Sequence, residues 1–228
     1  MTMPFYVSPE QVMKDRADYA RKGIARGKSL IAMSISSGVV VVAENPSRTL
    51  NKISEIYDRI TFAGVGKYNE FEMLRIAGVR QADLKGFSFA RADVNARSLA
   101  NAYAQTLGQV FTHEMKPYEV EILVAQVGLD ATQDELFHIL YDGTVMDESD
   151  FTVLGGEAEQ VAEALGGNFS LSMSRDSAIK AAAAALSSPD SEPLSAAQLE
   201  VAFMGRTRSR RTFERLSAPD LEKILTAK

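Results

Sequence analysis

The side chains best suited to bind a metal ion or move a proton are two histidines, His113 and His138. They fall on different predicted elements, and neither has a ligand spacing around it, so we expect structural histidines and no metal site. Cysteine is absent, which excludes thiolate ligands, disulfides and a thiol nucleophile. Serines are plentiful, but none stands in a Ser-His-acid motif. The sequence therefore predicts no catalytic residue, no metal and no cofactor.

A glycine-rich run at residues 63–67 has the look of a phosphate-binding loop but lacks its key residues. Thr61 stands where the first glycine of a Walker A loop belongs, and Tyr68 replaces the residue that would bind magnesium. We interpret the run as a strand end that turns into a helix. Gly155 and Gly156, ahead of another predicted helix, are likewise interpreted as a turn rather than an anion site.

The one basic cluster comprises five arginines near the C-terminus: Arg206, Arg208, Arg210, Arg211 and Arg215. The cluster straddles a predicted hairpin, so alternate side chains should face solvent, and a solvated edge is the expected state. Contact with an acidic partner is the alternative.

The composition predicts a soluble globular protein. The chain has 228 residues, 46% hydrophobic and 24% charged, with a net charge of −5. The negative net charge gives no reason to expect nucleic-acid binding. The N-terminus lacks the basic start and apolar run of a signal peptide. The most apolar window, residues 30–43, is too short and too polar to span a bilayer. We therefore expect a cytoplasmic protein without a membrane partner.

Helical signals begin at Ser8, an N-cap followed by Pro9 in the first helical position. Gln11 would complete a capping box, and the helix should extend to about residue 25. A second helix is predicted at 68–77, with Gly78 as its stop. Further helices are predicted at residues 95–113, 157–165 and 175–186, and after Pro219.

Strands are predicted in blocks between these helices. Residues 30–35 and 39–43 flank a Ser-Ser-Gly turn, and Asp142-Gly143 is a strong hairpin signal. Other strands are predicted at residues 60–66, 119–127, 135–141, 151–154, 199–204 and 211–216. Strands in blocks with paired helices between them favour antiparallel sheets covered on their outer faces. The sequence thus predicts the α+β class and a four-layer αββα sandwich.

Several long motifs closely resemble proteasome α subunits of actinobacterial type. They stand at residues 8–11, 20–26, 42–48, 52–59, 66–71, 99–108 and 116–120. The resemblance covers about residues 8–216 and implies the sandwich of the N-terminal nucleophile hydrolases. It also implies one domain, 1–228, with a gating segment at 1–7, a ring-face helix at 8–25 and a C-terminal helix and tail at 217–228.

The resemblance implies a non-catalytic subunit of a threonine-type peptidase complex. In the catalytic β subunits the nucleophile is a threonine that becomes the mature N-terminus, whose own amine helps to move the proton. Here that place falls at Lys28 or Ser29, behind an intact helix. Glu44 stands where β subunits carry an acid, and Lys52 corresponds to their active-site lysine.

The resemblance further implies heptameric α rings that cap β rings, gate substrate entry and dock activator rings. The implied gate comprises Pro4, Phe5, Tyr6, Val7, Ser8 and Pro9. The implied pocket for an activator's C-terminal carboxylate comprises Lys52, Gly66, Asp18 and Arg21. Implied partners are further copies of the chain, β subunits, a proteasomal AAA ATPase in a Pup-proteasome pathway, and ATP-independent activator rings.

One departure separates this sequence from archaeal and eukaryotic α subunits. They carry a Tyr-Asp-Arg motif near the N-terminus that holds the gate open, whereas here Tyr6 is followed by Val7 and Ser8.

Two alternatives also stay open: a self-standing hydrolase of the same fold that uses Ser29 after processing, and a homo-oligomeric binding protein without β partners.

Overall fold

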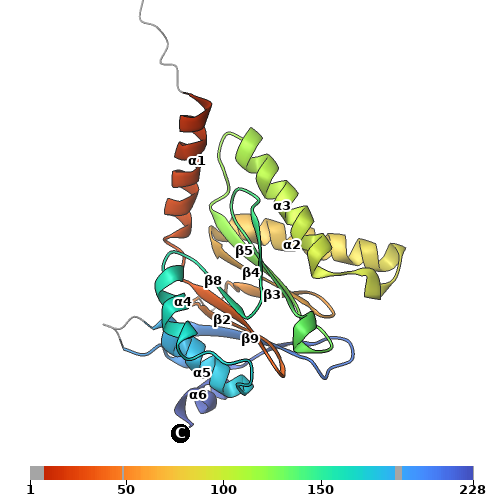
Figure 1. Cartoon of the computed structure of the whole chain (residues 1–228), viewed down its shortest axis with the longest axis vertical. Helices are drawn as coiled ribbons and strands as arrows, with labels where there is room; N and C mark the ends of the chain where they lie inside the picture. Colours follow the sequence, from red (N-terminus) through yellow and green to blue (C-terminus); the bar gives the residue numbers. More distant parts are fainter. Residues whose placement is uncertain (1–7, 48, 188–191, 228) are drawn as a thin grey trace, which may run out of the picture.

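Two antiparallel five-stranded sheets lie face to face, with helices on both outer sides (Figure 1). The computed structural model describes residues 8–47, 49–187 and 192–227. Its helices are α1 (Pro9–Ile24), α2 (Tyr68–Ser88), α3 (Ala96–His113), α4 (Ala158–Gly166), α5 (Arg175–Leu186) and α6 (Ala218–Thr226). The predicted αββα sandwich is confirmed.

The first sheet has the strand order β10-β9-β2-β1-β8. Its strands are β1 (Leu30–Ile35), β2 (Gly38–Glu44), β8 (Phe151–Leu154), β9 (Leu199–Gly205) and β10 (Phe213–Arg215). The tight turn at Ser36-Ser37 joins β1 to β2 with Ile35 opposite Gly38, as the sequence predicts. This sheet carries α4, α5 and α6 on its outer face.

The second sheet has the order β3-β4-β5-β6-β7 and carries α2 and α3. Its strands are β3 (Ile53–Tyr57), β4 (Ile60–Gly66), β5 (Val120–Gln126), β6 (Glu135–Ile139) and β7 (Val145–Glu148). The Asp142-Gly143 turn joins β6 to β7, which confirms the second predicted hairpin.

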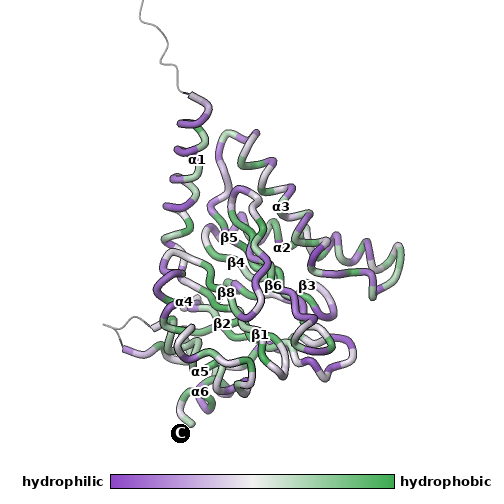
Figure 2. Tube along the Cα trace, in the orientation of Figure 1, coloured by the Kyte–Doolittle hydropathy of each residue, from purple (hydrophilic) through white to green (hydrophobic). Residues whose placement is uncertain are grey.

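Three apolar layers follow from the strand alternation of the two sheets. Along β2, Val39 and Val41 face the interior between the sheets, whereas Val40 and Val42 face α4 to α6. Phe62 on β4 points the other way, into the layer under α2 and α3. The tube in Figure 2 is correspondingly green through the strands and mixed along the helices.

Helix α1 begins as predicted but with half of the predicted capping box. Ser8 is the N-cap, and its hydroxyl accepts a hydrogen bond from the Gln11 amide at 3.2 Å. The Gln11 side chain donates instead to Asp15, at 2.7 Å. Only Ala20 and Ile24 of α1 are buried, and the N-terminal half extends away from the sandwich (Figure 1). In the described part, no helix combines the length and apolarity needed to cross a membrane.

Helix α2 does not end at Gly78, so that prediction is wrong. The helix continues to Ser88, and Gly78 is buried in its interior. A Cβ at this position would lie 1.7 Å from the Tyr103 hydroxyl of α3. Glycine is therefore required by the close approach of the two helices rather than by a helix end. Of the apolar residues in its first half, Phe71 and Leu74 are buried, whereas Met73 and Ile76 are exposed.

Gly78→Ala should lower the melting temperature, although alanine favours a helix interior by about 1 kcal/mol. The buried Tyr103 hydroxyl has no hydrogen-bond partner within the described residues, so Tyr103→Phe should cost little. Calorimetry of both single variants and the double variant measures the coupling. If the steric argument holds, Tyr103→Phe restores much of the stability that Gly78→Ala removes. Additive effects would contradict it.

Candidate functional site

Lys52 lies where the chain crosses from one sheet to the other, immediately before β3. Its carbonyl oxygen accepts a hydrogen bond from the amide of Gly64 on β4, at 3.1 Å. Its ammonium donates to the carbonyl oxygen of Lys28, just ahead of β1, at 2.5 Å. The backbone of Lys52 therefore belongs to the second sheet, while its charge lies against the start of the first.

Lys28 and Glu44 form an ion pair beside this ammonium. The Lys28 Nζ lies 2.9 Å from Glu44 Oε1, and the Glu44 amide donates to the Ser29 carbonyl at 3.1 Å. The Lys28 side chain is 60% exposed, whereas that of Glu44 is 16% exposed. The positions that the sequence singled out as counterparts of a nucleophile, an acid and a lysine thus form one cluster.

The electrostatics of the two lysines differ. Burial lowers the pKa of Lys52 to about 8, because a desolvated ammonium is unfavourable, and Lys28 adds to the effect. Glu44 and Glu200 oppose this lowering. Pairing with Glu44 instead raises the pKa of Lys28. Lys28 therefore stays charged at neutral and mildly alkaline pH, whereas Lys52 loses its proton within that range.

Gly66 ends β4 at the same end of the sandwich as Lys52. Its φ is +107°, and a Cβ would lie 2.0 Å from the carbonyl oxygen of Glu119, so only glycine fits. Gly27 packs against it, since a Cβ on Gly27 would lie 2.9 Å from the Gly66 nitrogen. Gly27 directly precedes Lys28, whose carbonyl binds the Lys52 ammonium. The structure thus brings these two pocket positions to one end.

Asp18 and Arg21 lie one turn apart on α1. The Arg21 Nη1 is 3.5 Å from Asp18 Oδ1, and the Arg21 guanidinium lies 5.8 Å from the centre of the Tyr141 ring. Among residues 8–47, 49–187 and 192–227 of a single chain, these contacts do not join the pair to Lys52. Their place in the predicted pocket stays a prediction.

The predicted gate falls mainly outside the described residues. Pro4, Phe5, Tyr6 and Val7 belong to that part of the chain. Ser8 and Pro9 are described, as the N-cap and first residue of α1.

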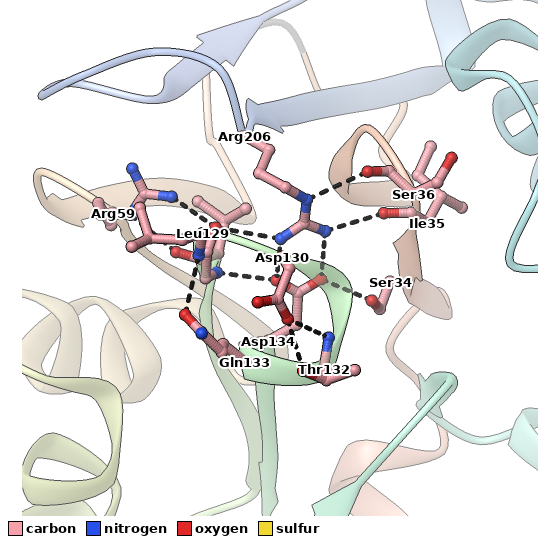
Figure 3. Close-up of polar contacts among 12 residues, drawn as sticks. Ser34, Ile35, Ser36, Arg59, Leu129, Asp130, Thr132, Gln133, Asp134 and Arg206 are labelled. Carbon is pink, nitrogen blue, oxygen red and sulfur yellow. Dashed lines mark hydrogen bonds and ion pairs between the residues drawn. The ribbon is translucent and has the colours of Figure 1, made fainter.

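The expectation of a solvated arginine edge is wrong for Arg206. Its side chain is 9% exposed and pairs with the Asp134 carboxylate, with Nη1 2.7 Å from Oδ1 (Figure 3). It also donates to the carbonyl oxygens of Ile35, Ser36 and Gly128. This buried pair joins the turns of both sheets at the end opposite Lys52.

Three of the other four arginines pair with carboxylates of this chain. Arg208 pairs with Glu214, and Arg211 with Glu55, at exposed positions that agree with the predicted edge. Arg215 pairs with the buried Glu200. Because Glu200 also contacts the Lys52 backbone, the last arginine belongs to the surroundings of the candidate site.

The two histidines lie in different surroundings. His138 is buried, with Nε2 3.3 Å from Glu121 Oε2, and His113 lies exposed with Nδ1 3.2 Å from the Gln109 carbonyl oxygen. In the described part of the chain, no three His, Cys, Asp or Glu side chains are grouped as metal ligands.

The two-sheet antiparallel sandwich between helix layers, with α1 packed on β4 and β5, agrees with the fold implied for a proteasome-type subunit. The chain belongs to the proteasome subunit family, whose model, described as "Proteasome subunit", matches residues 24–204. The family model does not distinguish α from β subunits by its description, whereas the relatives that match nearly the full chain do.

Those relatives are named "Proteasome subunit alpha". The protein of Acidimicrobium ferrooxidans is 58% identical over 225 residues, which are 99% of this chain and 97% of that protein. The protein of Sanguibacter keddieii is 56% identical, over 100% of this chain and 91% of that protein. The protein of Thermomonospora curvata is 54% identical, over 99% of this chain and 98% of that protein. The resemblance to α subunits of this type is confirmed.

Proposed function

We propose that the chain is the non-catalytic α subunit of a bacterial proteasome core. Seven copies form a ring that caps the proteolytic β rings, gates the entry of substrates and docks the C-terminal tails of an ATPase or activator ring. Relatives named as proteasome α subunits along nearly the full chain support this proposal.

The observation that carries the non-catalytic role is that Ser29 is an internal residue, preceded by α1. Glu44 and Lys52 lie next to Lys28 and Ser29, much as an acid and a lysine would surround a nucleophile. The Ser29 nitrogen, however, is a peptide amide that follows α1 and Lys28. A proton acceptor of the N-terminal type requires a free amine, so the cluster cannot activate a nucleophile in the intact chain.

The same cluster supports carboxylate docking. Lys52 is partly buried at the end of the sandwich, where an ammonium binds a carboxylate with a charge-assisted hydrogen bond of about 1.5–3 kcal/mol. Asp18 and Arg21 stand on α1 without a contact to Lys52 inside one described chain. A pocket shared by neighbouring subunits accommodates both observations. Seven such pockets would add avidity.

The gate is tested by hydrolysis of a fluorogenic peptide with the chain co-expressed with its β partner. A version that lacks residues 2–7 should hydrolyse the peptide several-fold faster than the full-length form. It keeps Ser8, whose hydroxyl caps α1, so helix uncapping does not confuse the result. A version that lacks residues 2–8 measures the effect of the cap separately.

The α chain alone serves as the control for the non-catalytic role. No hydrolysis is expected from it, and intact mass should retain residue 1 or 2, which excludes processing to Ser29. Activity from the α chain alone would favour the self-standing hydrolase. Equal rates for the truncated and full-length complexes would remove the gate from the proposal.

A further inference from the structure

Glu200 presents a buried carboxylate to the candidate docking site from the neighbouring strand β9. The residue is 8% exposed and pairs across the first sheet with Ala43 of β2. Its Oε2 accepts a hydrogen bond from the Lys52 amide at 2.8 Å and from Asn45 Nδ2 at 2.6 Å. A carboxylate is rarely buried in a strand, and here its hydrogen-bond donors come from the connection between β2 and β3. This arrangement calls for an explanation.

The second oxygen of Glu200 binds the first residue of β3. Oε1 accepts from the Ile53 amide at 3.1 Å and from the Arg215 guanidinium. Arg215 also donates from Nη2 to the Ile53 carbonyl oxygen, at 2.6 Å. The pair of Glu200 and Arg215 therefore binds both backbone polar groups of Ile53, next to Lys52.

These bonds fix the end of the connection from β2 of the first sheet to β3 of the second. The described residues between those strands, 45–47 and 49–52, have no ladder of their own. With the Lys52 amide bound by Glu200 and the Lys52 carbonyl bound by Gly64, the residue's backbone is fixed on both sides. Because the backbone is fixed, the Lys52 side chain starts from a fixed Cα position, and its ammonium reaches the carbonyl oxygen of Lys28.

We propose that Glu200 is a positioning residue for tail docking: it fixes the backbone of Lys52 and contributes a carboxylate to the charges around its ammonium. This inference rests on the proposed docking function and goes beyond it by assigning a residue from a distant part of the chain. Arg215 and Asn45 act through Glu200, since both donate to its carboxylate.

The charged groups that face Lys52 come from three elements. Glu44 at the end of β2 and Glu200 on β9 raise its pKa, whereas Lys28 ahead of β1 lowers it. Loss of the Glu200 charge should therefore lower the Lys52 pKa further. A residue with a purely structural role would weaken docking without this change in pH dependence.

The test uses assembled α–β cores and a short labelled peptide that carries the C-terminal sequence of the cognate proteasomal ATPase. Binding is followed by anisotropy between pH 6.5 and 9.5, a range in which the peptide carboxylate stays ionised. Glu200→Gln should weaken binding at pH 7 about tenfold, and the midpoint of the pH profile should fall below about 8. Glu200→Asp keeps the charge but shortens the reach, so affinity should fall while the midpoint stays near 8.

Matched variants separate the possible failures. Glu214→Gln, on the adjacent strand β10 and paired with Arg208, should bind as wild type. Unchanged binding by Lys52→Ala would remove the docking function itself. Loss of binding in Lys52→Ala, with wild-type affinity and midpoint in Glu200→Gln, would overturn the role of Glu200 alone. Should Glu200→Gln not assemble, Glu200→Asp decides: weakened affinity supports the proposal, and wild-type affinity overturns it.

Discussion

Lys52→Ala is expected to abolish most of the stimulation that an ATPase ring gives to degradation, while α–β assembly stays intact. One charge-assisted bond of about 1.5–3 kcal/mol corresponds to a loss of roughly tenfold to a hundredfold in affinity for each docked tail. Because several tails bind one ring, the loss in avidity is larger than for a single site. The rate of degradation of an unfolded substrate with and without the ATPase measures it.

The matched control is Lys22→Ala, which removes an exposed lysine from α1. It should degrade the substrate at the wild-type rate. Basal peptide hydrolysis by α–β complexes whose α chain lacks residues 2–7 should be equal in all variants, because the β active sites are unchanged. Normal stimulation in Lys52→Ala would show that the tail binds elsewhere.

Docking should weaken as the pH rises through the Lys52 pKa of about 8. A carboxylate is attracted to the ammonium and not to the amine, so affinity should fall by up to about tenfold per pH unit above the midpoint. Lys52→Arg keeps its charge throughout this range, and its profile should be nearly flat between pH 7 and 9.5.

Unfolding does not explain such a loss, because the linkage has the opposite sign. The folded-state pKa of Lys52 lies below the ordinary 10.5, so the unfolded state binds more protons between about pH 8 and 10.5. The unfavourable contribution of Lys52 to stability is complete below pH 8 and is relieved as the pH rises. Stability with respect to this residue increases where docking decreases.

Local signals in the sequence predict those elements whose geometry is decided within a few residues. Ser8-Pro9 marks the start of α1, Ser36-Ser37-Gly38 the first hairpin and Asp142-Gly143 the second. Strand β3 carries a weak signal, because its five residues follow a loop and Ser54 and Glu55 are only half buried. The end assigned to α2 at Gly78 is wrong because the reason for that glycine lies on another helix.

The residues of the candidate site likewise fall into those that local sequence motifs predict and those that they do not. Glu44 and Lys52 could be assigned from motifs that stand next to them in the sequence, and the structure brings both beside Lys28. Glu200 could not, because it lies 148 residues from the amide that it binds, and nothing around it in the sequence is distinctive. The burial of Arg206 was missed for a related reason: period-2 alternation describes a strand, whereas its partner Asp134 comes from a loop of the other sheet.

Asp134→Ala is expected to destabilise the fold by about 3–5 kcal/mol, since it leaves Arg206 as an unpaired buried charge. The Asp134 side chain is 1% exposed and also accepts from the Ser34 hydroxyl, at 2.5 Å, and from the Gly128 amide, at 2.8 Å (Figure 3). For a chain of this length the melting temperature should fall by about 6–20 °C. Calorimetry measures it, with Asp147→Ala as the control, because that carboxylate is 60% exposed and 3.6 Å from Arg97.

A double variant, Asp134→Leu with Arg206→Met, distinguishes an ion pair from a wider network. Replacing a simple buried pair with apolar residues of similar volume often restores or increases stability. Here Arg206 also donates to the carbonyl oxygens of Ile35, Ser36 and Gly128, which would lose their donor. The double variant should therefore remain about as unstable as Asp134→Ala. Recovery to the wild-type melting temperature would show that these carbonyl groups find other partners and that the charge pair alone matters.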